Sequence, residues 1–193
     1  MSREHAFALV PFGVAEPDAG LRLSGRIGRD GERLWVSYGL AGPLQRLAIP
    51  PLSTAPRRRD ELWQATCMEL FLALPNQEAY REFNLSPSGD WNVYQLDGYR
   101  EGLRPDPAWS ALPLRRRDPE PASAAAAAES EPTDTLELHL TTTLPPELAA
   151  AAELEAAVTA VLQEGDGSCS YWALRHPGEQ ADFHRRDGFA LRL

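Results

Sequence analysis

Two acids and an amide occupy alternate positions in two neighbouring segments that are rich in strand-forming residues. The first segment, residues 67–72, carries Glu69, and the second, residues 80–86, carries Glu82 and Asn84. Side chains on a strand alternate between its two faces, so ordinary antiparallel turns would place these three groups and Trp91 on one face. Carboxylates, an amide and broad rings suit a polyhydroxylated ligand, whose hydroxyls need hydrogen-bond partners and whose C–H faces stack on rings. This mixed face is therefore our candidate ligand site.

The same pattern permits other interpretations. Alternating polar and apolar residues are typical of any half-exposed sheet, so the mixed face could instead lie under a loop or contact another protein. Glu69 and Glu82 could also act as the acid and base of a glycosidase, but that needs a deep cleft and a raised pKa, for which the sequence offers no sign. We expect a binding domain, not an enzyme.

Familiar catalytic and metal-binding motifs do not occur in the sequence. The segment Gly165–Cys169 lacks the Gly-x-Ser-x-Gly pattern of a nucleophile elbow, and neither a phosphate-binding glycine loop nor a His-Glu-x-x-His motif is found. The four histidines lack metal-ligand spacing among themselves and with the cysteines. We therefore expect no catalytic residue and no metal site.

The elements that must position the mixed face are short strands. Residues 21–40 alternate in hydrophobicity around Arg29-Asp30-Gly31, which predicts a β-hairpin, and Pro87–Asp90 predicts a turn between two further strands. Residues 145–164 predict a short helical turn followed by a strand. About ten strands with frequent turns indicate a two-sheet antiparallel β-sandwich with at most one short helix. We expect a single domain over residues 1–193, with a flexible insertion rich in Ala, Pro and Glu at residues 119–132.

Charge and hydropathy exclude several partners. The 193 residues carry a formal net charge of -9, which disfavours binding to a nucleic-acid backbone. The sequence shows no signal peptide and no apolar run long enough to cross a bilayer, so we expect a cytoplasmic location and no membrane partner.

Three blocks of sequence resemble the DOMON-like superfamily, which includes the family 9 carbohydrate-binding modules. The blocks are Arg59–Leu72, Tyr80–Trp91 and Asp182–Leu193, and the likeness is greatest to a bacterial subgroup of stand-alone DOMON-like proteins. The resemblance implies an immunoglobulin-like, jelly-roll-like sandwich with a pocket on one sheet. In its relatives that pocket holds either a sugar or a haem.

The resemblance also implies roles for individual residues. Trp63 and Glu69 are similar to a ring and an acid that hold the sugar in carbohydrate-binding relatives, and Phe183 or Trp172 would supply a second ring. The haem-binding relatives use a Met and a His, for which this chain offers Met68 with His139, His176 or His184. Strand periodicity turns Met68 toward the core, which disfavours haem, and we expect no cofactor.

We accordingly predict a non-catalytic domain that binds a small ligand, a carbohydrate or a glycan fragment. A haem-binding domain and a protein-interaction module without a small ligand remain alternatives. Trp63 and Trp91 would stack on the ligand, Glu69, Glu82 and Asn84 would take its hydroxyls, and Phe183 and His184 would close one side.

Overall fold

One sheet is built around the hairpin that the sequence predicts. In the computed structural model, which describes residues 3–13, 20–119 and 135–193, strands β2 (Arg22–Asp30) and β3 (Arg33–Ala41) pair with Asp30 opposite Arg33. Gly31 lies in the turn at a φ of 58°, which glycine adopts at little cost. β1 (Arg3–Pro11) pairs with β2, and β9 (Thr135–Thr143) and then β8 (Arg115–Arg117) extend the sheet beyond β3. We call this five-strand layer sheet A.

The second layer, sheet B, contains the strands that carry the candidate site. Its order is β7 (Arg104–Pro105), β6 (Trp91–Leu96), β5 (Tyr80–Leu85), β4 (Cys67–Ala73), β10 (Glu155–Gln163) and β11 (Cys169–Ala173). The two-residue β12 (Leu191–Arg192) also pairs with β10, at the first two residues of β10. All of these pairings are antiparallel. β4, β5 and β6 therefore form the meander that the sequence predicts.

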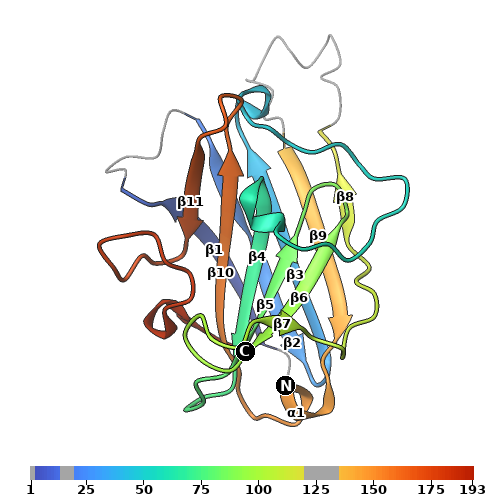
Figure 1. Ribbon diagram of the computed structural model, residues 1–193, viewed down its shortest axis with the longest axis vertical. Helices are drawn as coiled ribbons and strands as arrows, with labels where there is room; N and C mark the ends of the chain where they lie inside the picture. Colours follow the sequence, from blue (N-terminus) through green and yellow to red (C-terminus); the bar gives the residue numbers. More distant parts are fainter. Residues whose placement is uncertain (1–2, 14–19, 120–134) are drawn as a thin grey trace.

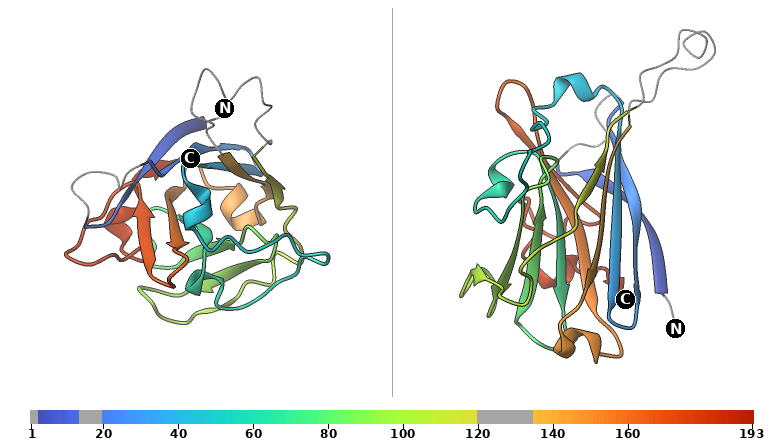
Figure 2. Two further views of the ribbon diagram at one scale, coloured as in Figure 1. Left: turned by 90° about the horizontal axis from the view of Figure 1, so that it is seen from above. Right: turned by 90° about the vertical axis from the view of Figure 1, so that its right-hand side faces the viewer.

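The main hydrophobic core lies between the two sheets, which are seen edge-on in the right-hand view of Figure 2. Leu70 and Phe83 of sheet B and Val36 and Leu138 of sheet A are among its fully buried members. Tyr38 crosses the core and donates a hydrogen bond from its hydroxyl to the Glu69 carbonyl oxygen over 2.7 Å. A candidate site residue is thus tied through its backbone to the opposite sheet.

β1 belongs to both sheets. Its residue Leu9 lies opposite Leu23 in sheet A, whereas the next residue, Val10, lies opposite Ala173 of β11 in sheet B. Figure 1 shows β1 passing behind β10 toward β11. Hydrogen bonds therefore connect the two layers along this side of the sandwich.

The predicted antiparallel β-sandwich with one short helix is confirmed for the described residues. α1 (Pro146–Ala149) is a single helical turn followed by β10, as predicted for residues 145–164. Three 3-10 turns, η1 (Leu44–Arg46), η2 (Leu62–Gln64) and η4 (Arg186–Gly188), lie in connections. The predicted insertion at 119–132 lies, apart from Pro119, outside the described residues. No helix in the described ranges is long and apolar enough to cross a membrane.

The predicted orientation of β6 was wrong. Leu85 lies directly opposite Trp91 across the loop of residues 86–90, so the two side chains share a face. Trp91 consequently points into the core between the sheets, where it is 4% exposed, and the Arg58 guanidinium lies 4.6 Å from the centre of its ring. The face of β6 that adjoins Glu69 and Glu82, which was predicted to carry Trp91, carries Asn92, Tyr94 and Leu96 instead.

Candidate functional site

The outer face of sheet B is covered rather than open to water. Residues 174–190, which we call the C-terminal segment, fold back across it and bring Phe189 within 5.8 Å of the ring centres of both Phe71 and Tyr80. Trp63 and Phe183 pack at the border of this second hydrophobic cluster. The predicted mixed face thus lies beneath a loop that has its own aromatic residues.

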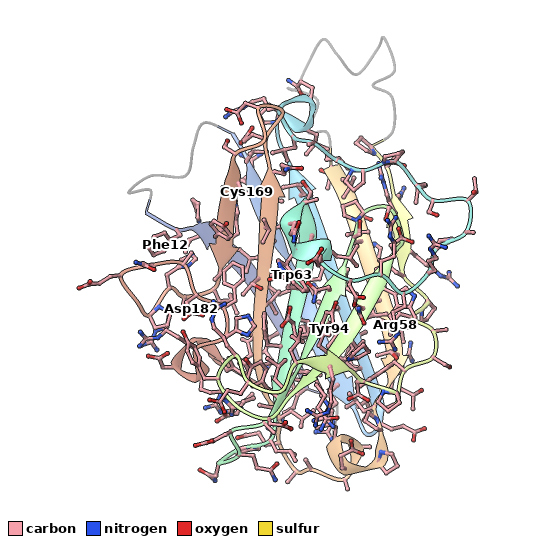
Figure 3. The ribbon with its side chains drawn as sticks, in the orientation of Figure 1. Phe12, Arg58, Trp63, Tyr94, Cys169 and Asp182 are labelled. Carbon is pink, nitrogen blue, oxygen red and sulfur yellow. The ribbon has the colours of Figure 1, made fainter. Side chains whose placement is uncertain are left out.

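A cavity of about 650 Å³ lies between the outer face of sheet B and the C-terminal segment. Its volume is within the range of about 300–1,000 Å³ that is usual for small-molecule sites. Figure 3 shows Trp63 in front of β4, with Phe12 and Asp182 toward the β11 side. The lining residues are Phe12, Trp63, Glu69, Phe71, Glu82, Leu96, Arg100, Leu103, Val161, Tyr171, Gln180, Ala181, Phe183 and His184.

Aromatic rings form two opposite parts of the lining. Trp63, carried by η2, contacts Tyr94 edge-to-face at 5.7 Å between ring centres, and the Tyr94 hydroxyl donates a hydrogen bond to Asp60. Toward β11, Tyr171 and Phe183 lie 6.1 Å apart, also edge-to-face. Packing against neighbouring rings therefore positions Trp63, Tyr171 and Phe183 before any ligand arrives.

Two buried carboxyl groups form the polar part of the cavity floor. Glu69 lies opposite Asn84 and Glu82 lies opposite Phe71, so the two acids are diagonal neighbours on β4 and β5. Thr159 donates a hydrogen bond to Glu69 Oε2 over 3.1 Å, and the Asn84 amide donates one to Glu82 Oε1 over 2.8 Å. Burial raises the pKa of both carboxyls, that of Glu69 well above its usual range, and proximity to Glu82 raises the Glu69 pKa further.

His184 enters the cavity from the C-terminal segment as a neutral imidazole. Burial lowers its pKa to about 4, and the nearby Arg100 guanidinium also disfavours its charged form. Its Nδ1 lies 2.7 Å from the Tyr80 hydroxyl and forms a hydrogen bond with it. Arg100 itself forms an ion pair with Asp182 at 3.0 Å. Near neutral pH the cavity lining therefore includes a neutral histidine, His184, and an arginine, Arg100, that already has a carboxylate partner.

The structure brings together five of the seven predicted site residues. Trp63, Glu69, Glu82, Phe183 and His184 all line the cavity. The sixth, Asn84, is fully buried behind the lining and orients Glu82, so a role in taking ligand hydroxyls directly does not fit its position. The seventh, Trp91, lies on the opposite face of the sheet and cannot stack on a ligand here.

Other lining residues were missed by sequence reasoning. Arg100 lies in the loop after β6, Phe12 directly follows β1, and Tyr171 is the one strongly exposed aromatic residue of β11. No motif marks Arg100 or Phe12. Tyr171 could have been found from strand alternation, since Trp172 beside it is buried and the two must face opposite ways.

The residues do not fit a haem. Met68 is fully buried between the sheets, whereas His184 lies on the outer face of sheet B, and His139 is exposed on sheet A beside Glu137. His176 lies on the C-terminal segment, where it hydrogen-bonds the Val10 carbonyl. The predicted methionine and any of its histidine partners are thus on different faces. Among the described residues, no group of three or more His, Cys, Asp or Glu side chains could hold a metal ion.

Comparisons with known proteins show a likeness in fold. No family model and no curated protein matches the sequence. A crystal structure of a proposed carbohydrate-binding protein from Bacteroides uniformis ATCC 8492 is 14% identical, with 94% of this chain and 84% of that chain covered and a TM-score of 0.59.

Two structures of a family 9 carbohydrate-binding module from Caldicellulosiruptor kristjanssonii overlap less closely. The complex with cellotriose is 11% identical, covers 88% of this chain and 72% of that chain, and has a TM-score of 0.45. The complex with glucose is 13% identical, covers 82% and 69%, and has a TM-score of 0.40. The chain is therefore similar in fold to the Bacteroides protein.

Proposed function

We propose that the chain binds a carbohydrate or glycan fragment, without changing it, in the cavity above sheet B. The observation that carries this proposal is the combination of aromatic rings on two sides with hydrogen-bonding carboxyls in the floor. Sugars present apolar C–H faces and polar hydroxyl edges, and such a site offers a partner to each. The fold shared with a proposed carbohydrate-binding protein agrees with this role. The resemblance to the DOMON-like superfamily stays a prediction.

A thermal-shift screen of the purified chain tests the proposal. A ligand that binds only the native state raises the melting temperature, so mono- and disaccharides, nucleotide sugars and muropeptides are compared with hemin. We expect a rise with at least one sugar class and none with hemin. If no sugar raises the melting temperature and the chain forms a stable dimer through this face, a protein-interaction role replaces the proposal.

Two variants locate the binding site. Trp63→Ala removes a ring and Glu69→Gln removes a hydrogen-bonding carboxylate, and each should abolish the sugar-induced rise. Trp35→Ala is the matched control, because Trp35 is also half-buried but lies on sheet A, where it hydrogen-bonds Glu4. Trp63→Ala should lower stability no more than Trp35→Ala does. If Trp63→Ala unfolds the chain, that tryptophan is structural and the site has been misplaced.

Glycoside hydrolysis is a second candidate function, favoured by one observation. The pKa values of both Glu69 and Glu82 are raised, as the acid of a glycosidase requires. Both carboxyls, however, lie on one floor, whereas a glycosidase needs its two acids on either side of the scissile bond. Incubation with a glycan that binds, followed by measurement of newly formed reducing ends, separates the two functions. Sustained release that Glu82→Gln abolishes would favour the hydrolase.

A further inference from the structure

The cavity floor has a hydrogen-bonding position that the chain leaves unfilled. Glu82 is 3% exposed, and its Oε1 accepts from Asn84, but its Oε2 is buried without any hydrogen-bond partner. A buried carboxyl oxygen without a partner is costly and uncommon in folded proteins. The terminal torsion of glutamate is broad, so a small rotation can turn this oxygen toward a group inside the cavity.

No cation of the described residues forms an ion pair with either of the two acids. Neither Glu69 nor Glu82 takes part in a salt bridge within those ranges, although both are buried. Arg100 is the one arginine that lines the cavity; it forms an ion pair with Asp182 at 3.0 Å, and its charge lowers the pKa of Glu82 without forming an ion pair with it. His184 is neutral near neutral pH because burial lowers its pKa to about 4. The two acidic side chains of the cavity floor, Glu69 and Glu82, therefore lack an ion-pair partner among the described residues.

The other walls suit a cation as well. The lining contains five aromatic rings, from Phe12, Trp63, Phe71, Tyr171 and Phe183. The faces of such rings attract ammonium groups, by about 0.5–2 kcal/mol for each contact according to exposure. A ring wall with an acidic floor is a better match for a positively charged group than for a hydroxyl alone.

We propose that the carbohydrate taken by this cavity carries a protonated primary amine, held between the Glu82 and Glu69 carboxyls and the aromatic walls. The class of ligand is thus the amino sugars with a free amine, and this inference rests on the proposed function. An ammonium group supplies three donors, which can satisfy Glu82 Oε2 and still reach Glu69. An N-acetylated amine has lost the charge and two of the donors.

Binding of such an amine has a proton balance that can be measured. Burial raises the pKa of both carboxyls, so the pair keeps a proton up to a higher pH than exposed carboxyls do; an incoming ammonium favours the carboxylate form, and any proton that the pair holds is released to solvent on binding. No covalent bond to carbon forms or breaks.

The neighbouring groups do not titrate in the same range. Besides Arg100 and Asp182, the groups that face the pair are Tyr38, Cys67, Tyr80, Tyr94 and His184. Burial raises the pKa of each tyrosine and of the cysteine and lowers that of the histidine, so all of these side chains stay neutral near neutral pH. At a pH where the ligand amine is fully protonated in solution, proton release on binding would therefore report the carboxyl pair.

The test compares sugars that differ only at C2. The gluco, galacto and manno monosaccharides are each titrated as the free amine, the N-acetyl derivative and the plain hydroxyl form, by calorimetry in two buffers of different ionisation enthalpy. Of the gluco, galacto and manno series, we consider the one that binds most tightly. In that series we expect the free amine to bind at least about tenfold more tightly than the N-acetyl or the hydroxyl form, which equals about 1.4 kcal/mol. Binding of the free amine should release a proton, whereas binding of the N-acetyl or hydroxyl form should not.

Variants show whether Glu82 is responsible for this preference. Glu82→Gln should reduce the ratio of amine to hydroxyl affinity by at least about tenfold, with a melting curve that confirms folding. Glu179→Gln, which removes an exposed acid of the C-terminal segment, should leave the ratio unchanged. Equal binding of all three C2 forms would overturn the amine inference and leave the proposed function standing. Absence of binding by all nine sugars would overturn the amine inference, and it would overturn the proposed function as well only if the thermal-shift screen also finds no carbohydrate ligand.

Discussion

The hydrogen bond between His184 and Tyr80 makes a definite prediction about stability in acid. The pKa of His184 falls from 6.5 to about 4 on folding, chiefly because the imidazole is buried. The unfolded chain therefore takes up a proton on this residue more readily than the folded chain does. Stability from the neutral imidazole is complete above about pH 6.5 and is lost as the pH falls toward about 4.

The size of the effect follows from the same two values. Each pKa unit corresponds to about 1.4 kcal/mol, so the fall from 6.5 to about 4 amounts to about 3 kcal/mol of unfolding free energy. Glu69 and Glu82 act in the opposite sense, because a raised pKa stabilises the folded chain at low pH and loses that contribution as the pH rises. The histidine contribution must therefore be read from a difference between two proteins.

His184→Asn is a suitable reference, because an asparagine amide can hydrogen-bond the Tyr80 hydroxyl near the position of Nδ1, as donor or acceptor, and does not titrate. Unfolding by urea, followed by tryptophan fluorescence, gives the free energy of both proteins between about pH 7.5 and about pH 4. We expect the free-energy difference between them to change by about 3 kcal/mol in favour of the variant as the pH falls. A difference that stays constant across this range would refute a buried neutral histidine.

Three other substitutions test the packing and the floor of the cavity. Trp91→Ala should lower the free energy of unfolding by about 3–5 kcal/mol, because the ring is buried beneath Arg58; a loss below about 1 kcal/mol in urea would contradict its place in the core. Gly25→Ala should prevent stable folding, because a Cβ there would lie 1.8 Å from the Ser37 carbonyl oxygen, and a normal melting curve would argue against this close approach of β2 and β3. Glu82→Gln should raise the melting temperature at about pH 8 more than at about pH 5, because it removes a carboxyl whose pKa is raised; calorimetry showing equal changes would mean that the carboxyl is not strained by burial.

Sequence reasoning succeeded where local pattern and local geometry agree. The hairpin of β2 and β3 follows from alternation around Asp30-Gly31, and both Glu69 and Glu82 were placed on one face because β4 and β5 each keep a strict two-residue period. The same period failed for β6, since the number of loop residues decides which face a strand presents after a turn. Five residues separate Leu85 from Trp91, so the two face the same way.

The walls of the cavity depend on contacts between distant segments, which no local pattern encodes. Phe12, Arg100 and Tyr171 come from three separate parts of the chain, and all three line the cavity between sheet B and the C-terminal segment. Strand β10 shows the same limit at the level of secondary structure. Ala156 and Ala157 favour a helix by propensity, yet both are buried strand residues, because pairing with Leu72 and Phe71 of β4 outweighs that preference.

The passage of β1 from one sheet to the other also limits how copies of this molecule can associate. Unpaired strand edges invite other chains to add strands, and the β1–β11 pairing closes the sandwich along one side. Among the described strands, the outermost on the other side are β7 and β8, of two and three residues. Proline supplies no N–H donor in β7, and both short strands carry arginine, so each is a poor template for a neighbour. Among the described strands, neither end of the sheet order therefore offers a long free edge for another copy to extend.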